Sequence, residues 1–312
     1  MRHTLRKIAF GGVLIFAGAA AAVAQVSDDV VKVGVLTDMT GAYSDLSGPG
    51  SLIAAQMAAE DFGGKVLGKP IVIISADHQN KPDIASSIAR KWFDEEHVDA
   101  IADLVTSSTA LAVMPVAAEK KRITLVSGAA SSAIEGDKCT AYNVHYTYNT
   151  YAMAAGTGRA VVQKGGKTWF FITADYVFGK SLEADTSKVV IASGGKILGG
   201  VKAPFPTTDF SSYLLQAQAS GAQIVGLANA GADTINAIKQ ANDSASPRSS
   251  PWLAFSSFSR TSTVSASPRR RGCISPPPSI GIATKKAASG RSGFSSVIRR
   301  CRRWSRPAST PR

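Results

Sequence analysis

Strand-like and helix-like patterns alternate along this chain from Val30 to Asp243, with short turns between them. The clearest amphipathic helix follows Pro82, where apolar residues recur at positions i, i+3, i+4, i+7 and i+8. Short apolar runs typical of buried strands cover residues 31–36, 71–75, 98–105 and 123–127. Strands separated by helices predict parallel sheets flanked by helices on both faces, so we expect an α/β fold.

The alternation falls into two halves. Residues 143–150 are aromatic and polar and interrupt the pattern, which restarts with a helix expected over 151–164. A length of 312 residues allows two domains of ordinary size. We therefore predict a first lobe over residues 25–145 and a second over 146–243. In such sheets ligands bind beyond the carboxyl ends of the strands, which directs attention to the loops there.

The formal net charge of +13 suggests a nucleic-acid binder, but the charge is unevenly distributed. Residues 1–24 hold three basic residues and no acid, and residues 244–312 hold 14 Lys and Arg with no Asp or Glu. The remainder has 18 basic and 22 acidic residues, a net charge of −4. A mildly acidic body gives no electrostatic footprint for nucleic acid, so no nucleic-acid partner is expected.

Residues 1–24 have the features of a secretory signal peptide. A basic start precedes an apolar run from Ile8 to Ala22, and Ala22-Val23-Ala24 is a small-x-small cleavage signal. The run is shorter than a membrane span normally needs. We expect cleavage after Ala24 and export to the periplasm.

Three adjacent hydroxyl residues, Thr106, Ser107 and Ser108, lie between a strand pattern and a helix pattern. They are placed to cap the helix N-terminus, whose free N–H groups and positive dipole end suit a carboxylate or another small anion. An ordinary Ser/Thr cap without a ligand is the simpler reading of these residues alone.

Several motifs, taken together, make residues 31–243 resemble the leucine/isoleucine/valine-type periplasmic substrate-binding proteins of ABC transporters. These proteins have the type I periplasmic-binding-protein fold. The motifs occur in the family's order and spacing, and they are VGVLTDMTGAY (33–43), GPG (48–50), DHQNKPD (77–83), TSST (106–109) with MP (114–115), SGAAS (127–131) and DYVFG (175–179).

The resemblance implies a two-lobed fold of parallel sheets flanked by helices, here incomplete at the C-terminus. It also implies that a ligand carboxylate is held between the lobes by hydroxyls and backbone N–H groups. The positions of this chain that match those loops are Thr106, Ser107, Ser108, Ala129 and Ser131.

The same resemblance implies aromatic side chains of the second lobe over the ligand, and Tyr176 and Phe178 match that turn. Tyr43 in the first loop is a further candidate for the wall. Packing in the core is the alternative for all three. The family often has an aromatic residue at the position of Ala230, and its neighbours Asn229 and Asp233 are candidates to meet polar groups of the ligand. Asp233 is also suited to capping the last helix. This departure makes an aromatic or other small organic acid a rival ligand to an amino acid.

No enzyme signature is convincing. Residues 63–69 spell most of a phosphate-binding P-loop, but Pro70 stands where Ser or Thr is needed and a strand follows in place of a helix. The sequence has no Gly-x-Ser-x-Gly and no His-Glu-x-x-His motif. We expect a protein that is not an enzyme, with no cofactor and no metal ligands.

The pattern breaks after Asp243. Residues 244–312 combine 14 basic residues with 18 Ser and no acid, a composition that predicts a disordered segment. We interpret this tail as the product of a reading-frame shift, and a genuine basic interaction tail is the alternative. The predicted function is the solute-binding component of an ABC importer. It would bind a branched-chain amino acid or another small carboxylate-bearing solute and deliver it to a permease in the inner membrane. A ligand-sensing regulator of the same fold is the second alternative.

Overall fold

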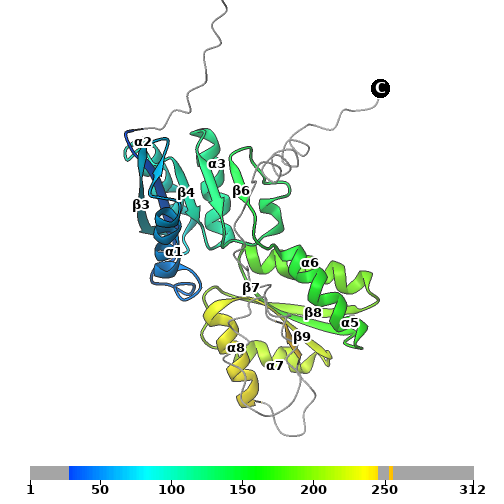
Figure 1. Ribbon diagram of the computed structural model, residues 1–312. Helices are drawn as coiled ribbons and strands as arrows, with labels where there is room; N and C mark the ends of the chain where they lie inside the picture. Colours follow the sequence, from blue (N-terminus) through cyan, green and yellow to red (C-terminus); the bar gives the residue numbers. More distant parts are fainter. Residues whose placement is uncertain (1–27, 245–252, 256–312) are drawn as a thin grey trace, which may run out of the picture.

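The computed structural model describes residues 28–244 and 253–255, which form two lobes, each built on its own sheet (Figure 1). The predicted α/β fold with parallel sheets and flanking helices is confirmed. The elements of the first lobe are β1 (Val31–Thr37), α1 (Gly48–Asp61), β2 (Lys65–Val66), β3 (Lys69–Asp77), α2 (Pro82–Asp94), β4 (Ala100–Asp103), α3 (Ser107–Glu119), β5 (Ile123–Val126), the 3₁₀ helix η1 (Ser132–Ile134) and β6 (Asn143–His145). Those that follow are α4 (Thr150–Met153), the π-helical segment η2 (Ala154–Gly158), α5 (Arg159–Gln163), β7 (Thr168–Ala174), α6 (Val177–Ala192), β8 (Lys196–Ala203), α7 (Ser211–Ala219), β9 (Ile224–Ala228), α8 (Gly231–Ser244) and β10 (Leu253–Phe255).

The first sheet has the order β2-β3-β1-β4-β5-β6, and every pair except β2–β3 is parallel. The second has the order β10-β9-β7-β8 and is parallel throughout. Because parallel strands end at one edge of their sheet, the loops after β1, β4 and β5 gather at one edge of the first sheet. The loops after β7 and β9 gather in the same way on the second.

The core of the first lobe lies between its sheet and the paired helices α2 and α3. Trp92 and Met114 from the helices pack there with Ile101 and Val126 from the strands. The connection through α1 runs from β1 outward to β3, whereas α2 returns across β1 to β4. Right-handed crossovers therefore place α1 on the other face. There Ile53, Met57 and Phe62 are exposed to 54%, 57% and 68%, so an apolar surface of α1 is uncovered in the described chain.

Two local predictions differ from the structure. The strand expected over 98–105 ends at Asp103, because Asp103 and Leu104 have left-handed backbones with φ of +78° and +54°. The helix expected over 151–164 is divided by η2, which contains Gly156 and Gly158. Glycine is a poor helix former and a π-helical turn is a common irregularity within a helix.

The predicted tail requires a correction at Leu253–Phe255, which form β10 and pair in parallel with β9. The reason is that these apolar residues carry no charge and satisfy the free edge of β9, a strand that is buried along its whole length. The remainder of the predicted tail, like the predicted signal peptide over 1–24, lies outside the described residues. Within the part of the chain that the structure covers, no helix combines the length and apolarity of a membrane span.

Gly34 in β1 provides a test of the packing of the first lobe. A Cβ atom at Gly34 would lie 2.3 Å from the ring of buried Trp92. Gly34→Ala is expected to lower the free energy of unfolding by about 1–3 kcal/mol, the usual cost of overpacking a core. The measurement is the midpoint of urea unfolding, with Gly50→Ala as the control because a Cβ at Gly50 meets nothing within 4 Å. Equal midpoints for the two variants would contradict this packing.

Candidate ligand-binding site

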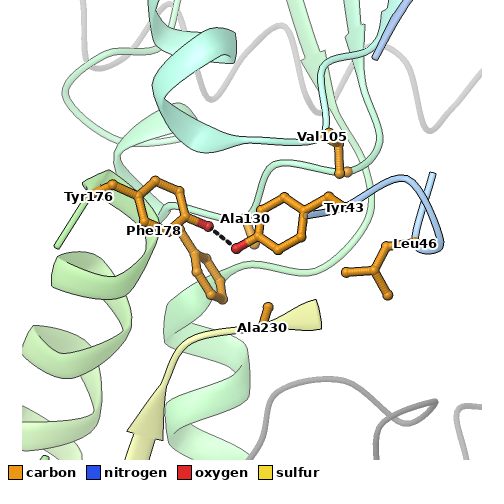
Figure 2. A pocket seen from close by; sticks show the side chains of 8 residues that line it. Tyr43, Leu46, Val105, Ala130, Tyr176, Phe178 and Ala230 are labelled. Carbon is orange, nitrogen blue, oxygen red and sulfur yellow. Dashed lines mark hydrogen bonds between the residues drawn. The ribbon is translucent and has the colours of Figure 1, made fainter. Parts of the chain in front are cut away.

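A small pocket lies where loops of the two lobes meet (Figure 2). Its cavity of about 20 Å³ is room for about one water molecule. The first lobe contributes Tyr43, Leu46, Val105, Gly128 and Ala130, and the second contributes Tyr176, Phe178 and Ala230. All of these residues follow the carboxyl ends of strands, at or near the start of the next helix. The parallel topology therefore builds the pocket, as the sequence pattern predicts.

The first turn of α3 supplies the predicted hydroxyls. Thr106 occupies the N-cap position and is buried, but its hydroxyl pairs with that of Thr109 at 2.8 Å and makes no cap hydrogen bond. Before it, the left-handed backbones of Asp103 and Leu104 turn the chain so that Val105 faces the pocket. Such backbones are costly for residues other than glycine and concentrate at functional sites.

Ser107 and Ser131 are joined across the two loops. The hydroxyl of Ser107 accepts the Ser131 N–H at 3.1 Å. The Ser131 hydroxyl in turn pairs with that of Ser181 on α6 at 2.6 Å, a contact between the lobes. Ser108 is half-buried in the first turn of α3. Ala129 packs into the core of the first lobe, whereas its neighbour Ala130 lines the pocket. The structure thus brings Ser107 and Ser131 together and directs Thr106 and Ala129 elsewhere.

Aromatic rings from both lobes form the other wall. The hydroxyls of Tyr43 and Tyr176 are 2.5 Å apart across the lobes (Figure 2). Phe205 stacks on Tyr176 with ring centroids 4.5 Å apart and lies 5.1 Å from Tyr43. Burial raises the pKa of the Tyr43 and Tyr176 phenols well above the usual value. Both therefore remain protonated at neutral pH, and the pair keeps one hydroxyl hydrogen to donate.

Asn229 and Asp233 are buried behind this wall, each 1% exposed. Thr234 donates its hydroxyl to Asn229 Oδ1 at 2.6 Å, and the Thr207 N–H donates to Asp233 Oδ1 at 3.2 Å. Asn229 Nδ2 and Asp233 Oδ2 have no hydrogen-bond partner among the described residues. Burial raises the pKa of Asp233 to about 6, against the opposing effect of the Thr207 N–H. The negative charge of Asp233 also acts on both tyrosine hydroxyls.

The sequence assigns no role to four of the pocket residues, which are Leu46, Val105, Gly128 and Ala130, nor to Phe205, which stacks on Tyr176 outside the lining. Leu46, Gly128 and Ala130 lie in loops expected at the carboxyl ends of strands, whereas Val105 is expected at the end of the strand over 98–105. Phe205 follows β8, and no chemical signal in the sequence distinguishes it from a core residue. Among the described residues, no cluster of three or more His, Cys, Asp or Glu is arranged to hold a metal ion.

Residues 30–261 match the family of periplasmic binding proteins. The chain belongs to this family. The resemblance drawn from the motifs is thereby confirmed, and the match extends beyond Asp243 through β10.

Among curated relatives, the Leu/Ile/Val-binding protein homolog 6 of Brucella abortus is 26% identical over 220 residues, which cover 70% of this chain and 55% of the relative. A periplasmic binding protein of Burkholderia mallei, solved as a crystal structure, is 52% identical with a TM-score of 0.73, over 76% of this chain and 63% of that protein. A branched-chain amino acid ABC transporter periplasmic ligand-binding protein of Burkholderia xenovorans is 42% identical with a TM-score of 0.62, over 75% and 63%. An ABC transporter solute-binding protein of R. palustris in complex with 4-hydroxybenzoate is 26% identical with a TM-score of 0.65, over 72% and 61%. This chain therefore spans about half the length of the curated relatives that it matches.

The raised pKa of Asp233 predicts how stability depends on pH. In the folded protein Asp233 binds its proton up to about pH 6, whereas an unfolded Asp loses it near pH 3.9. Wild-type stability should therefore fall relative to Asp233→Asn as pH rises from about 4 to 7, by roughly 2–3 kcal/mol at most. Urea unfolding at several pH values measures the difference. Asp45→Asn, at an exposed position, is the control, and a constant difference across this range would contradict the burial of an unpaired carboxyl.

Proposed function

We propose that this protein is the solute-binding component of an ABC importer, that it binds a small amino acid between its lobes, and that it is not an enzyme. The observation that carries the proposal is the pocket itself. Its lining joins loops from the carboxyl ends of strands in both sheets, so a ligand there contacts both lobes. Family membership and the Brucella and Burkholderia relatives support a transport role.

The polar groups around the pocket suit the two ends of an amino acid. The start of α3, with Ser107 and Ser108, and the loop that carries Ser131 offer hydroxyl and N–H donors for a carboxylate. Near the Tyr43 and Tyr176 hydroxyls, on which its charge acts, Asp233 Oδ2 is a buried acceptor without a partner among the described residues. An ammonium group would offset the cost of burying this carboxyl. Tyr43, Tyr176 and Phe178 would then enclose an apolar side chain.

An aromatic acid is the second candidate ligand. It is favoured by the rings of the pocket wall and by the R. palustris relative solved with 4-hydroxybenzoate. Such a ligand has no ammonium group, so it would leave Asp233 Oδ2 without a cationic partner. A substitution at Asp233 therefore distinguishes an amino-acid ligand from an aromatic acid.

Calorimetric titration of leucine and of 4-hydroxybenzoate tests the assignment. Replacing Ser107 or Ser108 by Ala should weaken binding of either ligand by about 1–3 kcal/mol, as for a hydrogen bond to a charged group. Asp233→Asn should weaken binding of leucine and spare 4-hydroxybenzoate. Ser87→Ala, on an exposed part of α2, is the matched control. Unchanged affinity in all the pocket variants would place the ligand elsewhere, and no binding of either ligand would refute the proposed function.

The proposal extends to export and to the partner. The predicted signal peptide, cleaved after Ala24, would deliver the protein to the periplasm, where the loaded protein would dock on an inner-membrane permease. The family is one of periplasmic binding proteins, which supports this location. N-terminal sequencing of protein secreted from a Gram-negative host is expected to begin at Gln25.

We also propose that the residues after β10 arise from a shifted reading frame. The uncovered apolar residues Ile53, Met57 and Phe62 on α1 support this, because a returning segment of the family kind would bury them. Translation of the DNA downstream of codon 255 in the other two frames should restore the strand–helix alternation. If neither frame does so, the basic tail is the native sequence.

A further inference from the structure

The loop that carries Tyr43 is organised by one buried carboxylate, that of Asp38. Asp38 follows β1 and is 0% exposed. Its Oδ1 accepts the Gly41 N–H at 2.8 Å, and its Oδ2 accepts the Tyr43 N–H at 2.8 Å. The side-chain amide of Asn80 donates to the same Oδ2 at 2.5 Å. Three donors on one carboxylate fix the turn between β1 and Tyr43, and hydrogen bonds to a charged acceptor are the stronger kind.

Asn80 lies shortly after the end of β3 and is held there by a hydrogen bond to His78. Its backbone N–H donates to Nδ1 of buried His78 at 3.1 Å. Burial lowers the pKa of His78 to about 4, so the ring is neutral and Nδ1 is free to accept. Asp77 accepts the Met39 N–H at 3.2 Å and the Thr40 hydroxyl at 2.8 Å, which ties down the start of the same loop. The loop is thus anchored to the end of β3 at Asp38 and at the two residues that follow it.

The loop that Asp38 holds carries Tyr43 into contact with the second lobe. Tyr43 is only 3% exposed and packs with the core residues of the second lobe. A Cβ atom at Gly231 would lie 2.9 Å from the Tyr43 ring, so the start of α8 approaches the ring too closely for any side chain. Tyr43 therefore extends from the first lobe into the packing of the second and forms part of the pocket wall.

We propose that Asp38 is a positioning residue that holds the Tyr43 ring across the gap between the lobes, and that Tyr43 thereby limits the size of ligand that the pocket accepts. The limit on ligand size rests on the proposed function, but the position of the ring does not. The close approach of the turn to Asp38 supports this role. A Cβ atom at Gly41 would lie 2.6 Å from the Asp38 carboxylate, so the turn packs tightly around that carboxylate.

Nitration with tetranitromethane reports on the ring without any ligand. In the full chain, Tyr43 should be protected, whereas Tyr146 and Tyr151, at 67% and 58% exposure, react as internal standards. Asp38→Ala should increase the rate of Tyr43 nitration, read by peptide mass spectrometry, by about tenfold or more, because the loop opens locally. Asp45→Asn removes the same charge from the same loop at an exposed position and should leave Tyr43 protected.

A second variant guards against a failure to fold. Asn80→Ala removes a single donor to Asp38 and leaves the bonds to Gly41 and Tyr43, so its nitration rate should lie between those of the wild type and Asp38→Ala. Thermal melting confirms that each variant is folded. Continued protection of Tyr43 in both folded variants would overturn the positioning role of Asp38.

Ligand preference tests the second part. Tyr43→Ala and Asp38→Ala should both shift the ratio of affinities toward 4-hydroxybenzoate and away from alanine by about tenfold or more. An unchanged ratio in Tyr43→Ala would overturn the size limit. If neither probe binds the wild type or any variant, the proposed function and the size limit fail together, while the nitration result still decides the role of Asp38.

Discussion

Parallel strand pairing is the constraint on which the rest of this structure depends. A parallel sheet cannot be closed by hairpins, so each strand is followed by a crossover, and all the strand ends that lead into helices lie at one edge. Both lobes obey this rule apart from the antiparallel pair β2–β3, and the pocket is lined by the loops and first helical turns that follow these edges. The chemistry of the site is consequently carried by short segments between a buried strand and a helix N-terminus. Rigid elements on both sides hold such segments with little freedom.

Three buried carboxyl groups differ in the hydrogen bonds that compensate their burial. Asp38, Asp103 and Asp233 are all withdrawn from solvent, yet they are compensated differently. Asp38 accepts three hydrogen bonds, and its charge is used to order a loop. Burial raises the pKa of Asp103, although the Ser127 hydroxyl, which donates to Oδ1 at 3.2 Å, opposes the shift. Asp233 accepts one backbone N–H, and burial raises its pKa to about 6 against the effect of that bond. A cationic group of a ligand placed near Asp233 would stabilise its charged form and offset the cost of burial.

The two lobes are unequal in how well they bury their apolar surface. In the first lobe, α2 and α3 bury apolar side chains against one face of the sheet, whereas large side chains of α1 and its C-terminal end are exposed on the other. In the second lobe, the short strand β10 satisfies the outer edge of β9. Exposed apolar surface lowers the net stability of a fold whose margin is small in any case. It also favours association between copies of the chain.

The sequence by itself determined the α/β class, the parallel sheets flanked by helices and most of the loops that line the pocket, because apolar periodicity and turn residues are local properties of the chain. Motifs also identified Tyr43, Tyr176 and Phe178, which line the pocket, and Ser107 and Ser131, which meet across two loops. Only the tertiary structure decided that Ala130 rather than Ala129 faces the pocket, that Thr106 bonds to its own helix, and that Phe205 stacks behind Tyr176. It also decided that Leu253–Phe255 complete a sheet edge within a segment whose composition predicts disorder. Which neighbour a side chain meets depends on how strands and helices distant in sequence come together. That arrangement is fixed by packing and register, and no local pattern of residues records it.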